Sequence, residues 1–207
     1  MVMPAIRRRW TVEAVRALAS EERAWPRYEL VRGELVVTPA PGAIHQIAVL
    51  ELAKTLSEYL DRNPIGAVMV SPADLELEPG SVTQPDVFVV PASTDIAAQQ
   101  LQWSDVKSLV LAIEVLSPSS VRTDRVEKRD FYCDVGVPEY WIVDLDAQAV
   151  ERWTPMRETP EILRDQVVWT PPNGPPFSLD LVRLFDRITT IARMRRVPLA
   201  PDRPVIR

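Results

Sequence analysis

The stretch Leu109–Leu116, LVLAIEVL, is the hydrophobic centre of the sequence. It carries a single charged residue, Glu114, between Ile113 and Val115. Because apolar side chains occupy both alternating sets of positions, the run predicts a central strand that is buried on both faces. The segment Ser117-Pro118-Ser119-Ser120 ends it. A strand of this kind belongs in a sheet covered on both sides by other elements.

The segment that follows is expected to be a helix. Asp124 would be its N-cap, with Glu127 three residues later in the capping-box position and Gly136 as the C-cap. Short β-prone runs bounded by turn residues indicate the strands around this unit: 28–31, 34–37, 66–78, 82–90, 140–144 and 150–153. The last part of the chain indicates edge strands or a strand plus a helix, over 161–170 and 177–185.

The segment 43–62 predicts the most secure helix, because it contains no Gly or Pro. Its apolar residues recur at helical spacing: Ile44, Ile47, Ala48, Leu52, Leu56 and Tyr59. A shorter helix is expected over 11–24. The layout predicts one α/β domain over 1–207, with a central mixed β-sheet flanked by helices. An N-terminal helix and hairpin would occupy about 10–40, and an Arg-rich tail about 193–207.

Composition narrows the function classes. The chain has 207 residues, 46% of them hydrophobic, and a net charge of −5, which excludes disorder and gives no reason for bulk-charge binding to nucleic acid. A lone cysteine, Cys133, excludes a disulfide scaffold. No run approaches the ~20 apolar residues of a membrane span, and the first residues do not resemble a secretory signal. We therefore expect a cytoplasmic protein without membrane contact.

Glu114 is the informative anomaly of the central strand. An ionised carboxylate in an apolar strand costs several kcal/mol, so it should be paired, protonated or bound to a metal. Asp86 raises the same question, because it stands directly before Val87-Phe88-Val89-Val90. Two converging carboxylates repel each other unless a cation lies between them, and Mg²⁺ is a hard ion that such a pair binds. The alternative for Glu114 is a buried ion pair with an arginine from 122–129.

Lys128 is the candidate cation beside these acids. It is one of only three lysines in the chain, and its spacing from Asp124 and Tyr132 places all three on one face of the expected helix. A lysine above a metal–carboxylate cluster can orient a water molecule or stabilise charge on a phosphate. The alternative is a solvated Asp124–Lys128 ion pair.

The order of these motifs resembles a known family. Pro85-Asp86 followed by Glu114-Val115-Leu116 resembles the PD-(D/E)XK motif of restriction-endonuclease-like proteins, and the wider pattern resembles their Uma-type branch of bacterial endonucleases. Its segments run from 28 to 144: YELVRGEL (28–35), His45, QPDVFVV (84–90), AIEVLSPSS (112–120), Asp124, Lys128, Tyr132 and GVPEYWIVD (136–144).

The resemblance implies a four-stranded mixed sheet flanked by helices, with Asp86 and Glu114 as metal ligands and the Val115 carbonyl as a third. It also implies that Glu34 completes the acidic cluster, against the alternative that Glu34 only covers a turn. The superfamily motif has a lysine two residues after the glutamate, where this chain has Leu116. Members of the Uma-type branch use a lysine displaced onto the next helix, and Lys128 matches that position.

The sequence thus predicts a nuclease dependent on Mg²⁺ or Mn²⁺ that hydrolyses phosphodiester bonds in nucleic acid. DNA is the expected substrate, and a homodimer is the expected assembly. Asp86 and Glu114 would hold the metal, and Lys128 would position or deprotonate a water. Glu34 or His45 would tune the site, with His45 at its margin. Two alternatives stay open: a catalytically inactive nuclease fold used for binding or assembly, and a hydrolase of smaller phosphate esters.

Overall fold

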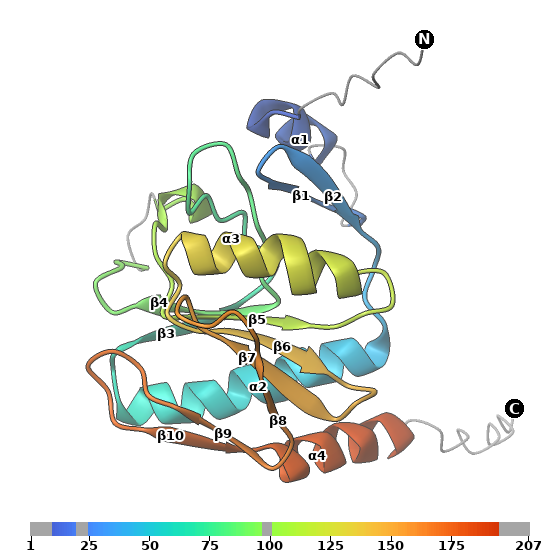
Figure 1. Ribbon diagram of the computed structural model, residues 1–207, viewed down its shortest axis with the longest axis vertical. Coiled ribbons are helices and arrows are strands. Elements are labelled where there is room, and N and C mark those ends of the chain that lie inside the picture. The colour runs from blue at the N-terminus through green and yellow to red at the C-terminus, as the bar shows by residue number, and fades with distance from the viewer. Residues whose placement is uncertain (1–9, 20–24, 97–100, 195–207) are drawn as a thin grey trace, which may run out of the picture.

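The computed structural model describes residues 10–19, 25–96 and 101–194. Figure 1 shows a central sheet with α2 and α4 on one face and α3 on the other, and with α1 and the hairpin β1–β2 beyond the α3 side. In chain order the elements are α1 (Val12–Ala19), β1 (Arg27–Val31), β2 (Glu34–Thr38), α2 (Ala43–Arg62), β3 (Gly66–Val70), β4 (Val87–Pro91), η1 (Trp103–Asp105), β5 (Leu111–Val115), η2 (Thr123–Lys128), α3 (Arg129–Asp134), β6 (Tyr140–Asp144), β7 (Ala149–Trp153), β8 (Glu161–Leu163), β9 (Gln166–Trp169), β10 (Phe177–Asp180) and α4 (Leu181–Met194).

The central sheet is mixed and has the strand order β3-β4-β5-β6-β7-β8. The pair β5–β6 is parallel, and the other neighbours are antiparallel. The parallel pair requires a long crossover, which η2 and α3 provide. The α/β class with a mixed sheet between helices is confirmed. The sheet has six strands where the resemblance implied four, because hairpin connections add β7 and β8.

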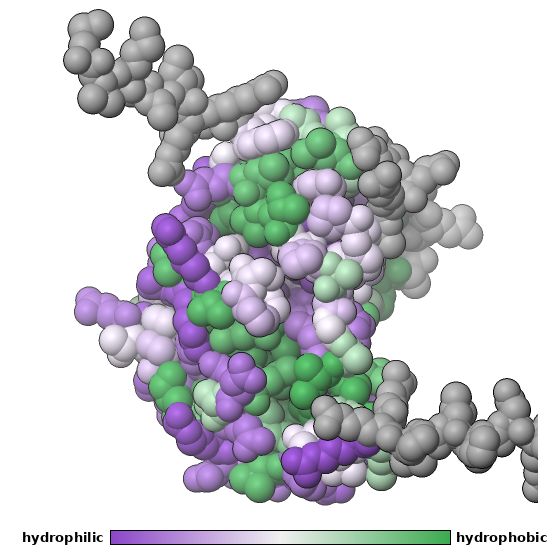
Figure 2. All heavy atoms as spheres, turned by 90° about the vertical axis from the view of Figure 1, so that its right-hand side faces the viewer, coloured by the Kyte–Doolittle hydropathy of each residue, from purple (hydrophilic) through white to green (hydrophobic). Residues whose placement is uncertain are grey.

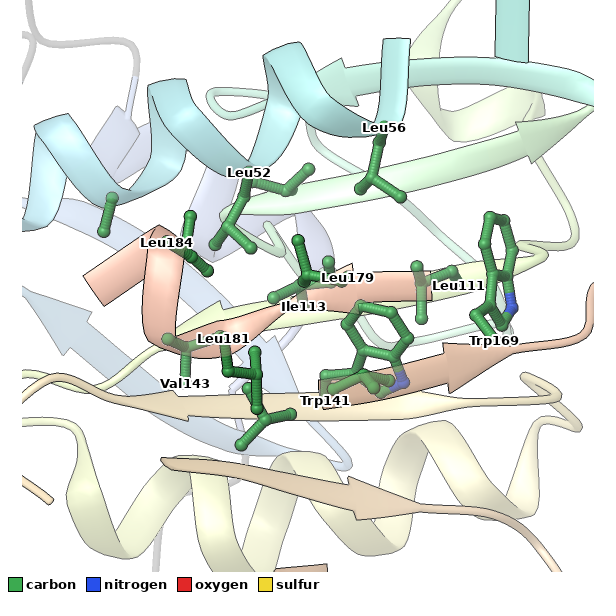
Figure 3. Close-up of a cluster of buried hydrophobic side chains, with 14 of the residues drawn as sticks. Leu52, Leu56, Leu111, Ile113, Trp141, Val143, Trp169, Leu179, Leu181 and Leu184 are labelled. Carbon is green, nitrogen blue, oxygen red and sulfur yellow. The ribbon is translucent and has the colours of Figure 1, made fainter. Parts of the chain in front are cut away.

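The strand β5 is buried at every residue, as the LVLAIEVL run predicts. Its alternate side chains divide between two cores. Leu111, Ile113 and Val115 join the core under α2 and α4, where Figure 3 shows Ile113 among leucines and tryptophans. Ala112 joins the core under α3. Glu114 is two residues after Ala112 in the same strand, so its side chain lies on the same face of the sheet, toward α3.

Two expectations about the first half of the chain need correction. The strands predicted over 66–78 and 82–90 are shorter in the structure, where they are β3 and β4. The segment between β3 and β4 forms isolated β-bridges in place of a strand pair, such as the bridge between Leu75 and Thr83. Prolines at 72, 79 and 85 cannot donate ladder hydrogen bonds, which explains the short strands. In α2 the predicted apolar face is buried except for Ile44, which is 46% exposed in the first turn.

At the C-terminal end, the expectation of a strand plus a helix is confirmed. The hairpin β9–β10 leads directly into α4, whose buried residues pack against α2. The expected Arg-rich tail lies outside the described residues from position 195 onward, as does the end of the helix predicted over 11–24. Within the described ranges, no helix combines the length and the apolar character needed to cross a membrane.

Part of the surface stays apolar. Figure 2 shows a side of the molecule on which hydrophobic residues gather in more than one area between hydrophilic ones. Large apolar side chains that are at least 50% exposed occur in β2, α2 and α4 as well as in loops: Val37, Leu50, Met156, Val182 and Met194. Single exposed apolar residues are normal on a protein surface, so these residues do not by themselves identify an interface.

Candidate active site

Asp86 and Glu114 are brought together by the register of β4 and β5. Val87 pairs with Ile113 in this antiparallel ladder, so the register places Asp86 opposite Glu114 one position further along, and opposed residues share a face. A side chain completes the ladder here, because the Val115 N–H donates to Asp86 Oδ2 over 3.0 Å. Both predicted carboxylates therefore lie at one end of β4 and β5, on the α3 side of the sheet.

Lys128 lies buried among three carboxylates. Its Nζ donates to Glu114 Oε1 over 2.7 Å. The same Nζ lies 2.9 Å from Glu29 Oε1 and 3.9 Å from Asp124 Oδ1. None of these four side chains is more than 5% exposed. Glu114 is therefore neutralised by Lys128, and not by an arginine of the 122–129 segment.

Glu29 enters this cluster from β1. Its Oε1 also accepts the backbone N–H of Gln84 over 2.7 Å, and the Gln84 side chain donates to Asp74 Oδ1 over 2.7 Å. Glu29 thus joins the N-terminal hairpin to the loop that precedes Asp86. Because Glu29 is only 1% exposed, its carboxylate holds both the lysine and this loop in place.

Asp86 has its own set of partners. Its Oδ1 lies 3.1 Å from Arg27 Nη2, and its Oδ2 lies 3.0 Å from His45 Nε2. Arg27 comes from β1 and His45 from the first turn of α2, so Asp86 is contacted from two elements far apart in sequence. The structure places His45 in direct contact with a predicted metal ligand.

A widened helical turn directs the acidic and basic side chains inward. The helix begins at 121, its segment η2 is π-helical, and α3 continues it. Asp124 is therefore not the predicted N-cap: it lies inside the helix, where its N–H donates to the Ser120 carbonyl over 2.8 Å. Asp124 is 2% exposed and Lys128 is 4% exposed. Such π-helical turns are frequent at functional sites.

The carboxylates have very different proton affinities. Burial would raise the pKa of Asp86, but the hydrogen bond and charge of His45 and the charge of Arg27 lower it to about 2. Burial raises the pKa of Glu114 well above its ordinary value against the opposing charge of Lys128, and the charges of Asp86, Asp124 and Glu29 raise it further. Burial likewise raises the pKa of Asp124 to about 6. Divergent pKa values among neighbouring acids are typical of functional sites.

Lys128 remains a cation in these surroundings. Burial alone would lower the pKa of its ammonium group, but the charges of Glu114, Glu29 and Asp124 raise it well above the ordinary value. A lysine with a raised pKa stays protonated at neutral pH and therefore cannot act as a general base. This side chain is therefore suited to binding and stabilising negative charge.

A pocket of about 220 Å³ opens beside Lys128, between β2 and η2. Lys128 and Asp124 line it, together with hydroxyl groups from the start of the helix and the exposed residue Glu34. Glu34 therefore lies at the pocket, at the hairpin turn opposite Val31. The hairpin carboxylate that touches Lys128 is that of Glu29, five residues earlier.

The cluster suits a divalent cation in charge and in donor type. Its four buried carboxylates face two permanent cations, Lys128 and Arg27, with His45 as a third only when protonated. Carboxyl groups thus outnumber the cations, and burial and neighbouring charges raise the pKa of Glu114 and Asp124. A bound Mg²⁺ or Mn²⁺ would favour the ionised carboxylates, whose oxygens are ligands that these ions accept. Within the described ranges, no three His, Cys, Asp or Glu side chains already have the spacing of a metal site. Metal binding would therefore replace some of the present ion pairs.

Glu29 and Arg27 are not predicted from the sequence, and Asp124 is predicted as a cap and lies inside the helix. Glu29 stands between Tyr28 and Leu30 in a β-prone run, so the anomaly that drew attention to Glu114 was present there too. Arg27 carried no such signal, because a single arginine at the start of a strand is ordinary. Only the fold shows that it reaches Asp86.

Comparison with known proteins gives a consistent result. A crystal structure described as a putative nuclease belonging to DUF820 from Anabaena variabilis ATCC 29413 is similar, with a TM-score of 0.70 and 19% sequence identity over 86% of this chain and 99% of that chain. At that identity the similarity shows the fold. No curated protein matches. The family model Uma2, described as "Putative restriction endonuclease", matches residues 12–183. That range includes every residue of the buried cluster, and the chain belongs to the Uma2 family.

Proposed function

We propose that this protein is a divalent-metal-dependent nuclease that hydrolyses phosphodiester bonds in DNA. The observation that carries the proposal is the excess of buried carboxyl groups over cations at the end of β4 and β5. Asp86 and Glu114 supply two of these carboxyl groups from opposed strand positions. A fold that needed only stability would gain from apolar residues here, because buried ion pairs rarely repay their desolvation.

The metal would be held by Asp86, Glu114 and the Val115 carbonyl. When bound, Mg²⁺ or Mn²⁺ would polarise the scissile phosphate and lower the pKa of a water molecule. The side chain of Asp86 is already oriented for this task by the Val115 amide and His45. His45 thereby acts on the metal through Asp86, as a positioning residue.

Lys128 would stabilise the negative charge that develops on the phosphate. Lys128 lines the pocket between β2 and η2, from which a ligand would reach it. Of the two roles expected from the sequence, the raised pKa favours charge stabilisation and positioning of the water over deprotonation of the water. Glu34, at the mouth of the same pocket, would influence the approach of the substrate.

The rival function is a nuclease fold that binds a partner without cleaving it. The observation in its favour is that every buried acid of the cluster already has a cation or a hydrogen-bond donor beside it. A site neutralised by its own residues can persist without a metal. The two functions differ in what a divalent ion does to the protein.

The test measures metal binding and cleavage separately. Calorimetric titration with Mn²⁺ should give binding to the wild type and at least tenfold weaker binding to Asp86→Asn and Glu114→Gln, because each variant removes the negative charge of a proposed ligand. Supercoiled plasmid, linear DNA and RNA are then incubated with each protein and Mg²⁺ or Mn²⁺. Both variants should lose cleavage, and Asp165→Asn, an exposed control beyond β8, should retain it.

The results separate the alternatives. Metal binding without cleavage of any of these nucleic acids would favour the binding module. Cleavage that survives in both Asp86→Asn and Glu114→Gln would exclude the proposed site. Cleavage of RNA alone would overturn DNA as the substrate. Light scattering of the same samples tests the expected homodimer, in which two copies would combine their basic surfaces on the nucleic acid.

A further inference from the structure

Two buried ring or guanidinium nitrogens next to Asp86 have no hydrogen-bond partner within the part of the chain that the structure describes. They are Arg27 Nε and His45 Nδ1. Each side chain is only 10% exposed. Leaving a buried polar group without a partner costs free energy, about 1–3 kcal/mol in proteins. Orphaned groups on both sides of one carboxylate indicate that a polar ligand completes their hydrogen bonding.

The oxygen of Asp86 that faces Arg27 has capacity to spare. A carboxylate oxygen has two lone pairs. Oδ2 already accepts from His45 Nε2 and from the Val115 amide. Oδ1 accepts one hydrogen bond, from Arg27. The unused lone pair of Asp86 is therefore on Oδ1, the oxygen that Arg27 contacts.

Arg27 is well placed to bind an anion there. The planar guanidinium offers five N–H donors and matches the oxygens of a phosphate. Arg27 is fixed at its backbone by pairing with Thr38 in the β1–β2 hairpin. Its guanidinium carbon lies 4.9 Å from the centre of the Trp25 ring. Both contacts limit its freedom, so little conformational entropy is lost when it binds.

We propose that Arg27 binds a non-bridging oxygen of the substrate phosphodiester, next to Asp86. This inference rests on the proposed function and adds a substrate-binding residue to it. In this role Arg27 neutralises Asp86 before the substrate arrives and then shares its donors between the carboxylate and the phosphate. The competing explanation is that Arg27 only balances the charge of Asp86 and never touches the substrate.

A salt titration of DNA binding separates these explanations. Each phosphate neutralised by a protein cation contributes about one unit to the slope of log K against log salt. The measurement uses Glu114→Gln as the parent, so that cleavage does not interfere, and a short fluorescein-labelled DNA duplex as the probe, followed by anisotropy. The second protein carries Arg27→Gln in addition. The control carries Arg183→Gln, an exposed arginine on α4, across the sheet from α3.

We expect Arg27→Gln to weaken binding about tenfold, the value of one lost charge-assisted hydrogen bond. The salt slope should fall by about one, and the control should change neither quantity. A purely structural role would leave the slope of the folded protein unchanged. An unchanged slope and affinity in Arg27→Gln, with DNA binding intact in the parent, would overturn the inference and leave the proposed function standing.

A failure of the proposed function gives a different pattern. In that case wild-type protein cleaves no nucleic acid and the parent binds none, and both proposals fall together. If Arg27→Gln does not fold, as judged by circular dichroism, the same salt titration on Arg27→Lys tests whether Arg27 contacts the phosphate. This variant keeps the charge and loses the guanidinium fork, so the inference expects weaker binding with an unchanged slope. Parental affinity in Arg27→Lys would overturn it.

Discussion

The two faces of the central sheet do different work with the same strands. On the side of α2 and α4, β5 contributes Leu111, Ile113 and Val115 to a continuous apolar core. On the side of α3, the core under the helix is interrupted by Glu114 and its partners. Burying a charge there costs stability that the apolar face must compensate. The difference shows that one face supports the fold and the other carries the chemistry.

Lys128→Met tests the charged face and should have the largest effect on stability. Removing the lysine leaves three buried carboxylates without their shared cation, which should lower the free energy of unfolding by about 3–5 kcal/mol at pH 8. Urea denaturation followed by fluorescence measures it. The control Lys54→Met removes a half-exposed lysine paired with Glu51 and should cost less than about 1 kcal/mol. Equal losses in the two variants would contradict the contrast between the faces.

The pH dependence of stability should change in Asp124→Asn. The pKa of Asp124 is raised from 3.8 to about 6 in the folded protein, so the folded state holds an extra proton between these values. The stability that the folded protein gains from this protonated Asp124 is therefore complete below pH 4 and is lost as the pH rises through 6. We expect the wild type to lose on the order of 1–3 kcal/mol over this range and the variant to lose less.

Thermal unfolding of both proteins from pH 4 to 7.5 measures this difference. Asp86 works in the opposite direction, because its lowered pKa gives stability that is lost as the pH falls toward 2. This carboxylate is present in both proteins and cancels in the comparison. Parallel profiles for wild type and variant would mean that Asp124 is not a buried acid of the kind described.

Ile113→Val tests the apolar face and should have the smallest effect. It removes one methylene from a fully buried side chain, which typically costs about 0.5–1.5 kcal/mol. Because Ile113 faces away from the charged cluster, Mn²⁺ affinity and cleavage should stay at the wild-type level. Denaturation and calorimetry on the same protein measure both. A loss of metal affinity here would show that the two faces are coupled.

The sequence predicts the apolar face well and the charged face in part. The alternation in LVLAIEVL and the periodicity of 43–62 set β5 and α2, because burial of these side chains dominates the local energy. Asp86 and Glu114 are predicted for the related reason that a charge beside or within an apolar strand needs an explanation, and Lys128 from the scarcity of lysine and its spacing on the helix. The register of β4 and β5 brings the two acids together, and η2 supplies the lysine.

The parts that could not be predicted depend on tertiary contacts. Nothing in the local sequence distinguishes Glu29 from Glu34 as the acid that reaches Lys128, since both lie on the same hairpin. The helix that contains Asp124 has a good cap signal at the wrong place: it begins at 121, and its π-helical turn holds Asp124 and Lys128 in buried ion pairs. Arg27 reaches Asp86 only through the packing of β1 beside the sheet.

The hydrogen bond from the Val115 amide to Asp86 also makes the site observable by spectroscopy. This amide would ordinarily end a strand ladder, yet its acceptor is a side chain whose charge density changes when a ligand coordinates it. Its proton resonance and its exchange rate with solvent therefore respond to events at Asp86, while the amides of Leu111 and Ile113 in the same strand serve as an internal reference. One backbone nucleus can report occupancy of the site without any label on the substrate.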